Sequence, residues 1–254
     1  MNIAEIKAFL DEKVEKYNHP DFIESDPISI PHLFSKKEDI EIVAFLVSTI
    51  AWGRRDQIIK SSKKLIKLLE YQPSDFVCNA SEADWVHFEN FYYRTFSSID
   101  CIYFLKALKH IYAEHGGLEK VFTKVYQLGD IKPSLIHFRE IFLGYDSAQR
   151  THKHVANILK GSSAKRINMF LRWMVRNDNR GVDFGLWNSI SMSDLLLPLD
   201  VHTGNVSRQL GLLKRKQNDM KAVDEVMMFL KTFEPKDPVK YDFALFSLGV
   251  NERF

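Results

Sequence analysis

Two segments in the second half of the chain hold residues whose types and spacing suit chemistry on an anionic ligand. In LKGSSAKRINMFLRWMVR, residues 159–176, four small residues break one helix and start another: Gly161, Ser162, Ser163 and Ala164. Backbone amides at such a turn, beside a helix N-terminus, are suited to bind phosphate without reading a base sequence. Lys165 follows the turn directly and adds a positive charge there.

The segment LPLDVHTGNVSRQLGLL, residues 197–213, places an acid at the start of a second helix. An apolar lead-in delivers Asp200 to the first turn, so we expect Asp200 to be the N-cap. Capping alone explains an aspartate here, because free amides and the helix dipole stabilise its charge. Lys165 is likewise explained as a solvent-exposed lysine beside Arg166. Spacing leaves both alternatives open.

The positive charge is concentrated in acid-free runs, although the formal net charge is only +2. Residues 147–177 hold seven Lys and Arg and no acid, and residues 201–218 hold four. Residues 54–67 hold six, opposed only by Asp56. Each run alone fits the solvated face of a helix. Three such runs favour a polyanionic partner, because a nucleic-acid surface needs clustered cations.

Length and composition exclude several classes of protein. The 254 residues, 45% hydrophobic and 27% charged, fit one globular unit over residues 1–254, with the two segments above within about 150–213. Cys78 and Cys101 form no CxxC pair, which argues against a zinc site, a cysteine-ligated cluster and a disulfide-built fold. The N-terminal segment is charged and no apolar run reaches membrane length, so we expect a cytoplasmic protein without a membrane partner.

Apolar residues recur at the helical period and no stretch alternates as a strand would, which predicts an all-α fold. We expect about ten helices, over residues 3–14, 39–50, 54–70, 98–115, 118–128, 134–142, 163–176, 201–210, 219–233 and 238–248. Asp39 and Asp237 are predicted to cap two of them, and Gly116-Gly117 to end a third.

In three places the sequence resembles the helix-hairpin-helix DNA glycosylase superfamily, which includes endonuclease III and 8-oxoguanine DNA glycosylase. LDVHTGNVSRQLGL resembles the family signature VDTHV…R…R, and KGSSAKRINMFLRWM resembles the second half of its hairpin. FLVSTIAWGRRDQIIKSSKKL is similar to its early helix-turn-helix. The resemblance implies a two-lobed helical fold with a cleft between the lobes. Five short sequence segments between about residues 26 and 249 resemble more closely a bacterial family within or near that superfamily. That closer resemblance implies no particular activity.

The resemblance also implies roles for individual residues. The family's catalytic aspartate falls on Asp200, its Schiff-base lysine on Lys165, and its wedge into the duplex on Trp52. DNA contacts are then expected from Trp52, Gly53, Arg54, Arg55, Gly161, Ser162, Ser163, Ala164, Arg166, Arg172, His202, Thr203 and Arg208. An insertion between the two segments could line a base pocket with Phe184 and Trp187, although large aromatics also serve as plain core.

Two departures from the family pattern matter. The turn has a single Gly161 where the family has a Leu-Pro-Gly-x-Gly-like turn, and Lys165 and Asp200 are 35 positions apart, further than in the family. The C-terminal four-cysteine cluster of endonuclease III is absent, so we expect no iron–sulfur cofactor and no metal. The chain also lacks a paired-carboxylate metal motif and a GxxxxGK[ST] loop, which argues against a nuclease or a phosphotransferase.

These observations predict a base-excision repair DNA glycosylase, with associated abasic-site lyase activity as a possible second step. Its partner would be double-stranded DNA with a damaged or abasic site. We expect the protein to be associated with the nucleoid in the cytoplasm and to be a monomer. Lys165 would act as a neutral amine, whose proton loss Arg166, Arg172 and the helix N-terminus favour. The alternatives are a non-catalytic binder of DNA or structured RNA that retains the fold, and a helical protein-interaction module.

Overall fold

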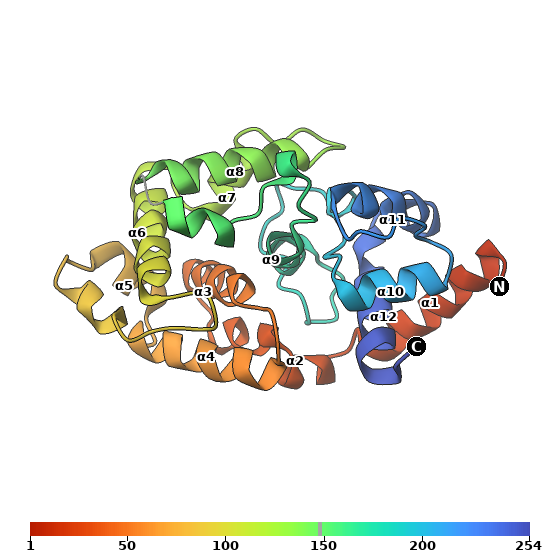
Figure 1. Cartoon of the computed structure of the whole chain (residues 1–254), viewed down its shortest axis with the longest axis horizontal. Helices are drawn as coiled ribbons and strands as arrows, with labels where there is room; N and C mark the ends of the chain where they lie inside the picture. The colour runs from red at the N-terminus through yellow and green to blue at the C-terminus, as the bar shows by residue number, and fades with distance from the viewer. Residues whose placement is uncertain (147–148) are drawn as a thin grey trace. The chain divides into compact units, whose positions relative to one another are not determined.

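The structure of the protein is a computed structural model that describes residues 1–146 and 149–254 (Figure 1). The described residues form α-helices, short 3-10 turns and a π-helical segment at Leu248–Glu252, without a strand, which confirms the all-α class. None of their helices is long and apolar enough to cross a membrane. We expected one unit over residues 1–254, whereas the chain divides into two compact units. Unit 1 holds residues 1–24, 127–131 and 157–254, and unit 2 holds residues 25–126 and 132–156.

Unit 2 is built around an aromatic core. Its helices are α3 (Lys37–Thr49), α4 (Arg55–Leu68), α5 (Pro73–Asn79), α6 (Ser98–Glu114), α7 (Leu118–Thr123) and α8 (Lys132–Gly144). Phe45 of α3 stacks on Phe104 of α6, with 5.7 Å between ring centroids, and meets Phe142 of α8 edge-on. As predicted, α6 ends before Gly116 and Gly117, whose φ angles of 73° and 100° favour glycine.

Unit 1 brings the two ends of the chain together. Its helices are α1 (Ile3–Tyr17), α9 (Lys165–Val175), α10 (Val201–Gln209), α11 (Met220–Phe233) and α12 (Tyr241–Ser247), while α2 (Asp21–Ser25) lies at its boundary. The first helix packs along α12, as the red and blue ribbons of Figure 1 show. Ile6, Leu10 and Val14 form the buried face of α1, at the spacing that predicted this helix.

Two predicted helix caps are wrong, and in both cases a tertiary partner takes the carboxylate. The N-cap of α3 is Lys36, while Asp39 accepts a 2.7 Å hydrogen bond from the backbone amide of Ser74. Asp237 precedes a 3-10 turn rather than α12, and both of its oxygens accept from Nε of Arg176 at 3.0 Å. The guanidinium offers Asp237 a full positive charge, which the amides of a cap do not.

Candidate functional site

The turn before α9 is a tight, internally bonded loop. It follows a 3-10 turn, Ile158–Lys160, and Gly161 adopts the left-handed conformation with φ 84°. The amides of Gly161 and Ser162 donate to the carbonyl oxygens of Ile158 and Asn157, so they are not the phosphate donors that we expected. Ala164 at the N-cap of α9 provides no side-chain cap, and Lys165 is the first residue of the helix. The turn therefore offers fewer backbone amides to an anion than the sequence predicted.

Asp200 caps α10, as the sequence predicted. Its Oδ1 accepts from the amides of His202 at 2.8 Å and Thr203 at 3.0 Å, and Thr203 Oγ1 returns a bond to the Asp200 amide. The Asp200 carbonyl oxygen accepts from Nδ2 of Asn218 at 2.8 Å. Within the described residues no hydrogen bond reaches the second carboxylate oxygen, Oδ2. The side chain therefore has one oxygen that holds it in place and one that is available to a ligand.

The two segments meet in unit 1. Ser163 Oγ donates to the carbonyl oxygen of Leu199 at 3.3 Å, which joins the turn before Lys165 to the residue before Asp200. The amide of Met220 donates to the Gly161 carbonyl oxygen at 3.0 Å, so α11 holds the turn from its other side. Lys165 and Asp200 also act electrostatically on one buried carboxyl group, that of Asp242.

Asp242 is the most perturbed acid of this region. It is 5% exposed on α12 and accepts a hydrogen bond from Nη1 of Arg172. Burial raises its pKa to about 6; Arg172 and Lys165 oppose that rise, and the negative charge of Asp200 adds to it. Of these three groups, Arg172 contacts the Asp242 carboxylate directly, through the hydrogen bond from Nη1.

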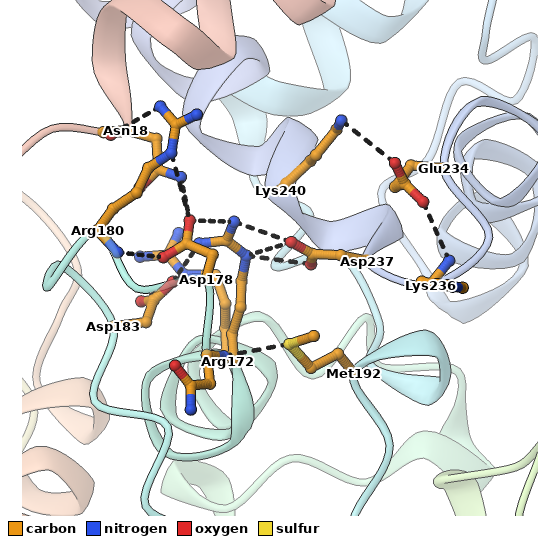
Figure 2. Close-up of polar contacts among 12 residues, drawn as sticks. Asn18, Arg172, Asp178, Arg180, Asp183, Met192, Glu234, Lys236, Asp237 and Lys240 are labelled. Carbon is orange, nitrogen blue, oxygen red and sulfur yellow. Dashed lines mark hydrogen bonds and ion pairs between the residues drawn. The ribbon is translucent and has the colours of Figure 1, made fainter.

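At the C-terminal end of α9, Arg176 lies in a buried ion network (Figure 2). Arg176 is 1% exposed and binds three carboxylates: both oxygens of Asp237 at 3.0 Å, Asp183 at 3.0 Å and Asp178 at 2.7 Å. Burial lowers the pKa of Arg176, but the three carboxylates outweigh it and raise that pKa overall. Buried charges persist only when paired in this way, so the network is structural.

The expected phosphate contact of Arg172 needs correction. Its side chain is 5% exposed, Nε donates to Asp183 at 3.2 Å, Nη1 donates to Asp242, and the guanidinium lies over the Phe243 ring at 4.4 Å. A guanidinium fixed on all sides in the interior does not meet the backbone of DNA. Arg172 instead belongs to the ion network.

Arg208 and Thr203 also have internal roles instead of the expected DNA contacts. Arg208 donates to the carbonyl oxygens of Arg215 and Lys216, both at 2.8 Å, and to Asn218 at 2.5 Å. It therefore supports Asn218, which binds the Asp200 carbonyl oxygen. Thr203 is fully buried as part of the cap. His202 is exposed, and Arg166 is half-buried.

The expected base pocket is half wrong. Trp187 is fully buried and meets Phe170 edge-on, with 5.4 Å between ring centroids, so it is core. Phe184 is half-buried, and its amide donates to the carbonyl oxygen of Trp173 at 2.8 Å. Of the two aromatic residues, Trp187 therefore serves as part of the hydrophobic core and does not line a pocket.

The residues assigned to the wedge lie in unit 2, between α3 and α4. Trp52 is half-buried. Its ring stacks on that of His154, with 6.1 Å between ring centroids, and its carbonyl oxygen accepts a hydrogen bond from the Tyr93 hydroxyl. Gly53 has φ 98°, a backbone conformation that favours glycine, and it lies beside the Arg94 side chain. Arg54 is exposed and pairs with Asp56 at 2.9 Å.

Arg55 begins α4 and is half-buried, whereas the lysines that follow form an exposed stripe. We call this set the α4 lysine stripe: Lys60, Lys63, Lys64 and Lys67. Their spacing places them on one side of the helix, and in the part of the chain that the structure describes none forms an ion pair. Like charges at this spacing repel one another, which a bound polyanion would relieve. The two N-terminal residues of the 147–177 run, Ser147 and Ala148, lie outside the described residues.

Three residues of the site were not singled out by the sequence: Asn168, Asn218 and Asp242. Asn168 is 1% exposed and donates to the carbonyl oxygen of Ser163 at 3.0 Å. Gly204 gives the signal for Asn218, because a Cβ at this helical glycine would lie 2.6 Å from the Asn218 side chain. Asp242 lies in the string KYDFALFSLG, but nothing in that string distinguishes a buried aspartate from a helix cap.

Comparisons with known proteins return one match. The model of a family described as "Protein of unknown function (DUF2400)" matches residues 26–251. Neither a curated protein nor a solved structure matches the chain. The match covers both the turn before α9 and the start of α10.

Proposed function

Because the chain belongs to the DUF2400 family, whose description assigns no activity, we propose a function from the geometry of the site: a DNA glycosylase that removes a damaged base. Asp200 would stabilise the sugar cation, and Lys165 would be the amine nucleophile of an associated abasic-site lyase. The observation that carries the proposal is the hydrogen bond from Ser163 Oγ to the carbonyl oxygen of Leu199, which joins the segments of Lys165 and Asp200 although these two residues are 35 positions apart in the sequence. The helix-hairpin-helix and the cleft implied by the resemblance belong to this proposal.

Asp200 suits a reaction in which positive charge develops on the sugar. Cleavage of the N-glycosidic bond makes the sugar cationic, and a fixed carboxylate stabilises that state without reorganising. Oδ1 holds the side chain against α10, while Oδ2 is available to the sugar. The nearby acid Asp242 is buried and bound to Arg172, so the proposal assigns it no contact with the substrate.

Lys165 suits covalent chemistry at the same sugar. Its neutral amine would attack the anomeric carbon as the base departs with the bonding electrons, and Asp200 would accept the proton released by nitrogen. Opening of the sugar then leaves an imine between Lys165 and the carbon, which borohydride reduces to a stable amine. The first turn of α9 would hold the neighbouring phosphate.

A non-catalytic binder of DNA is the second candidate, and two observations favour it. The amides of Gly161 and Ser162 are bonded within the turn, and Arg172 and Arg208 are bonded within unit 1. The α4 lysine stripe would still bind duplex DNA without reading sequence, as expected of a protein in the nucleoid. Such a protein would retain the fold and use Asp200 only as a helix cap.

One experiment separates the candidates. Wild-type protein is incubated with a panel of duplexes that each carry one damaged base or one abasic site. Base release is read as strand cleavage after alkali, lyase activity as cleavage without alkali, and binding as a gel shift. A glycosylase releases a base from at least one duplex, whereas binding to abasic DNA without release or cleavage supports the non-catalytic binder.

A further inference from the structure

The α4 lysine stripe lies on the solvent side of its helix in unit 2. The opposite side of α4 is buried and holds Ile58, Ser62, Leu65 and Ile66. From Lys60 to Lys67 the helix rises about 10 Å. Four exposed ammonium groups within this length suit a ligand with several closely spaced negative charges.

Lys64 joins the stripe to the neighbouring segment of residues 90–94. Its Nζ donates to the carbonyl oxygen of Asn90 at 3.1 Å and lies 5.9 Å from the ring centroids of both Phe91 and Tyr92. An ammonium group at this distance is attracted by the face of an aromatic ring. The stripe and Tyr92 therefore form one surface, which we call the α4–Tyr92 surface.

Tyr92 is held with its ring toward solvent. It is 73% exposed, whereas its neighbours Phe91 and Tyr93 are 1% and 5% exposed. The backbone groups of Tyr93 and Phe96 bond to each other at 2.8 and 2.9 Å, and the Tyr93 hydroxyl donates to the carbonyl oxygen of Trp52. Because both neighbours are fixed in the core of unit 2, Tyr92 is presented to a ligand without a rearrangement of the chain.

The α4–Tyr92 surface contains little negative charge. Asp56 is the only acid of α4 and is paired with Arg54 at 2.9 Å, and residues 90–94 include no acid. Glu70 and Glu89 flank the two segments, and among the described residues no ion pair joins either of them to the stripe. The charge of the surface is therefore complementary to a polyanion.

The exposed ring distinguishes among polyanions. Proteins that bind single-stranded nucleic acids combine cations that follow the backbone with aromatic side chains on which bases stack. In a duplex both faces of each base are covered by its neighbours in the stack, so only an unpaired base can stack on Tyr92. Contacts with the phosphates of a duplex would need the lysines alone.

We propose that the α4–Tyr92 surface binds single-stranded DNA, with lysines of the stripe on the phosphates and Tyr92 stacked on a base. Lys64 would help to position Tyr92, because its Nζ lies between Asn90 and the two rings. A fully paired duplex would meet the lysines without the stacked base. The choice of DNA as the strand rests on the proposed function, whereas the charge and the exposed ring do not.

Fluorescence anisotropy with an undamaged oligothymidylate tests the role of Tyr92. The labelled strand is roughly 12 nucleotides long, within the site sizes of single-strand-binding folds, and a duplex of equal length is the second ligand. Tyr92→Ala should weaken binding of the single strand roughly ten-fold or more and leave duplex binding unchanged. Tyr92→Phe keeps the ring and should bind both ligands as wild type does.

Ile99→Ala is the matched control, because it removes another large exposed side chain of unit 2, on α6, and should change neither affinity. Unchanged binding of the single strand by Tyr92→Ala, or an equal loss on both ligands, would overturn the proposal. Wild-type protein that binds neither ligand would overturn it as well.

Salt dependence tests the role of the lysines. Each phosphate contact with a single strand contributes roughly −0.7 to the slope of log affinity against log salt. Lys60→Ala with Lys63→Ala should therefore flatten the slope by about 0.7 to 1.4, whereas Tyr92→Ala should lower the affinity and keep the slope. A slope that the double variant leaves unchanged would refute the proposed phosphate contacts.

Photocross-linking tests the surface in the wild-type protein, without any variant. An oligothymidylate in which one thymine is replaced by an iodinated uracil is irradiated with the protein, and the adduct is located by peptide mass spectrometry. We expect the adduct on the peptide that contains Tyr92. Adducts confined to other peptides would overturn the proposal.

These outcomes are distinguishable from those of the proposed function. Binding that depends on Tyr92, together with no base release from the damaged duplexes, would support this surface and refute the glycosylase. Base release together with unchanged single-strand binding in Tyr92→Ala would refute this surface and leave the glycosylase standing. Tighter binding of an RNA strand of the same length would refute the choice of DNA.

Discussion

Ser163 donates a 3.3 Å hydrogen bond to the carbonyl oxygen of Leu199. This bond joins the turn that precedes Lys165 to the residue that precedes Asp200, across 36 positions of sequence. A catalytic carboxylate and an amine need such a link, because both must reach the same sugar carbon.

Asp200→Asn should reduce base release by roughly 10² or more while binding of lesion DNA changes only a few-fold. The asparagine oxygen still accepts from His202 and Thr203, so the cap and the fold remain. Single-turnover release on the best duplex of the panel measures the first effect, and a gel shift the second. Asp219→Asn is the control for an N-cap aspartate outside the site. Release unchanged in Asp200→Asn would assign Asp200 to capping alone.

Lys165→Gln should abolish the adduct that borohydride traps between the protein and abasic DNA. The amide nitrogen of glutamine cannot form an imine, so no covalent species is available for reduction. Lys160→Gln tests whether any lysine of the turn suffices, because Lys160 is exposed five positions earlier. Denaturing gel electrophoresis shows the adduct as a shifted band. An adduct retained in Lys165→Gln and lost in Lys160→Gln would move the nucleophile to Lys160.

Removing two lysines of the α4 lysine stripe, Lys60→Ala with Lys63→Ala, should weaken duplex binding and flatten its salt dependence. Each phosphate contact contributes roughly −0.9 to the slope of log affinity against log salt, so the slope should fall by about 1 to 2. Arg208→Ala should leave the slope unchanged, since Arg208 is bonded to the 215–218 loop. Binding titrations between low and moderate salt measure both. Equal slopes in wild type and the double variant would place the duplex elsewhere.

Arg172→Ala should lower the free energy of unfolding by about 3–5 kcal/mol, since it leaves Asp242 buried without its cation and Asp183 with Arg176 alone. Urea denaturation at pH 7 measures the loss. Arg180→Ala removes a guanidinium whose side chain is 35% exposed, and it should cost about 1 kcal/mol or less. Equal losses in the two variants would mean that Arg172 is not the buried partner that the structure shows.

Glu252→Gln should destabilise the protein at pH 7 and not at pH 2. Hydrogen bonds from Lys16, Tyr17 and Lys13 lower the pKa of Glu252 from 4.5 to about 2. Its contribution is therefore complete above pH 4.5 and is lost as the pH falls through about 2.

Because the Glu252 ion pairs lie at the surface, the difference at pH 7 should be about 1 kcal/mol or less. Urea denaturation across this pH range measures it. Glu12→Gln, on the exposed side of α1, is the control and should show no such pH-dependent difference. A difference that persists at pH 2 would contradict the assignment.

The sequence alone determined most of the helices and the cap of α10, but it did not predict α2 and α5, and its caps for α3 and α12 were wrong. The apolar period placed α1, α9, α10 and α11 to within a few residues, and the two glycines after α6 ended that helix where they were expected to. Asp200 was identified as a cap because the bonds of a cap join residues two or three positions apart. Interactions of that range depend on chain order, which the sequence displays directly.

Only the tertiary structure decided which charges are available to a ligand. Arg172 and Arg176 belong to an acid-free run, yet their carboxylate partners Asp183, Asp237 and Asp242 lie up to 70 positions away in the chain. The helical period shows which face of α9 is apolar, but it does not show which distant carboxylate a buried cation meets. Burial and pairing depend on neighbours that folding brings together. The sequence therefore could not predict that Asp242 is buried and bound to Arg172.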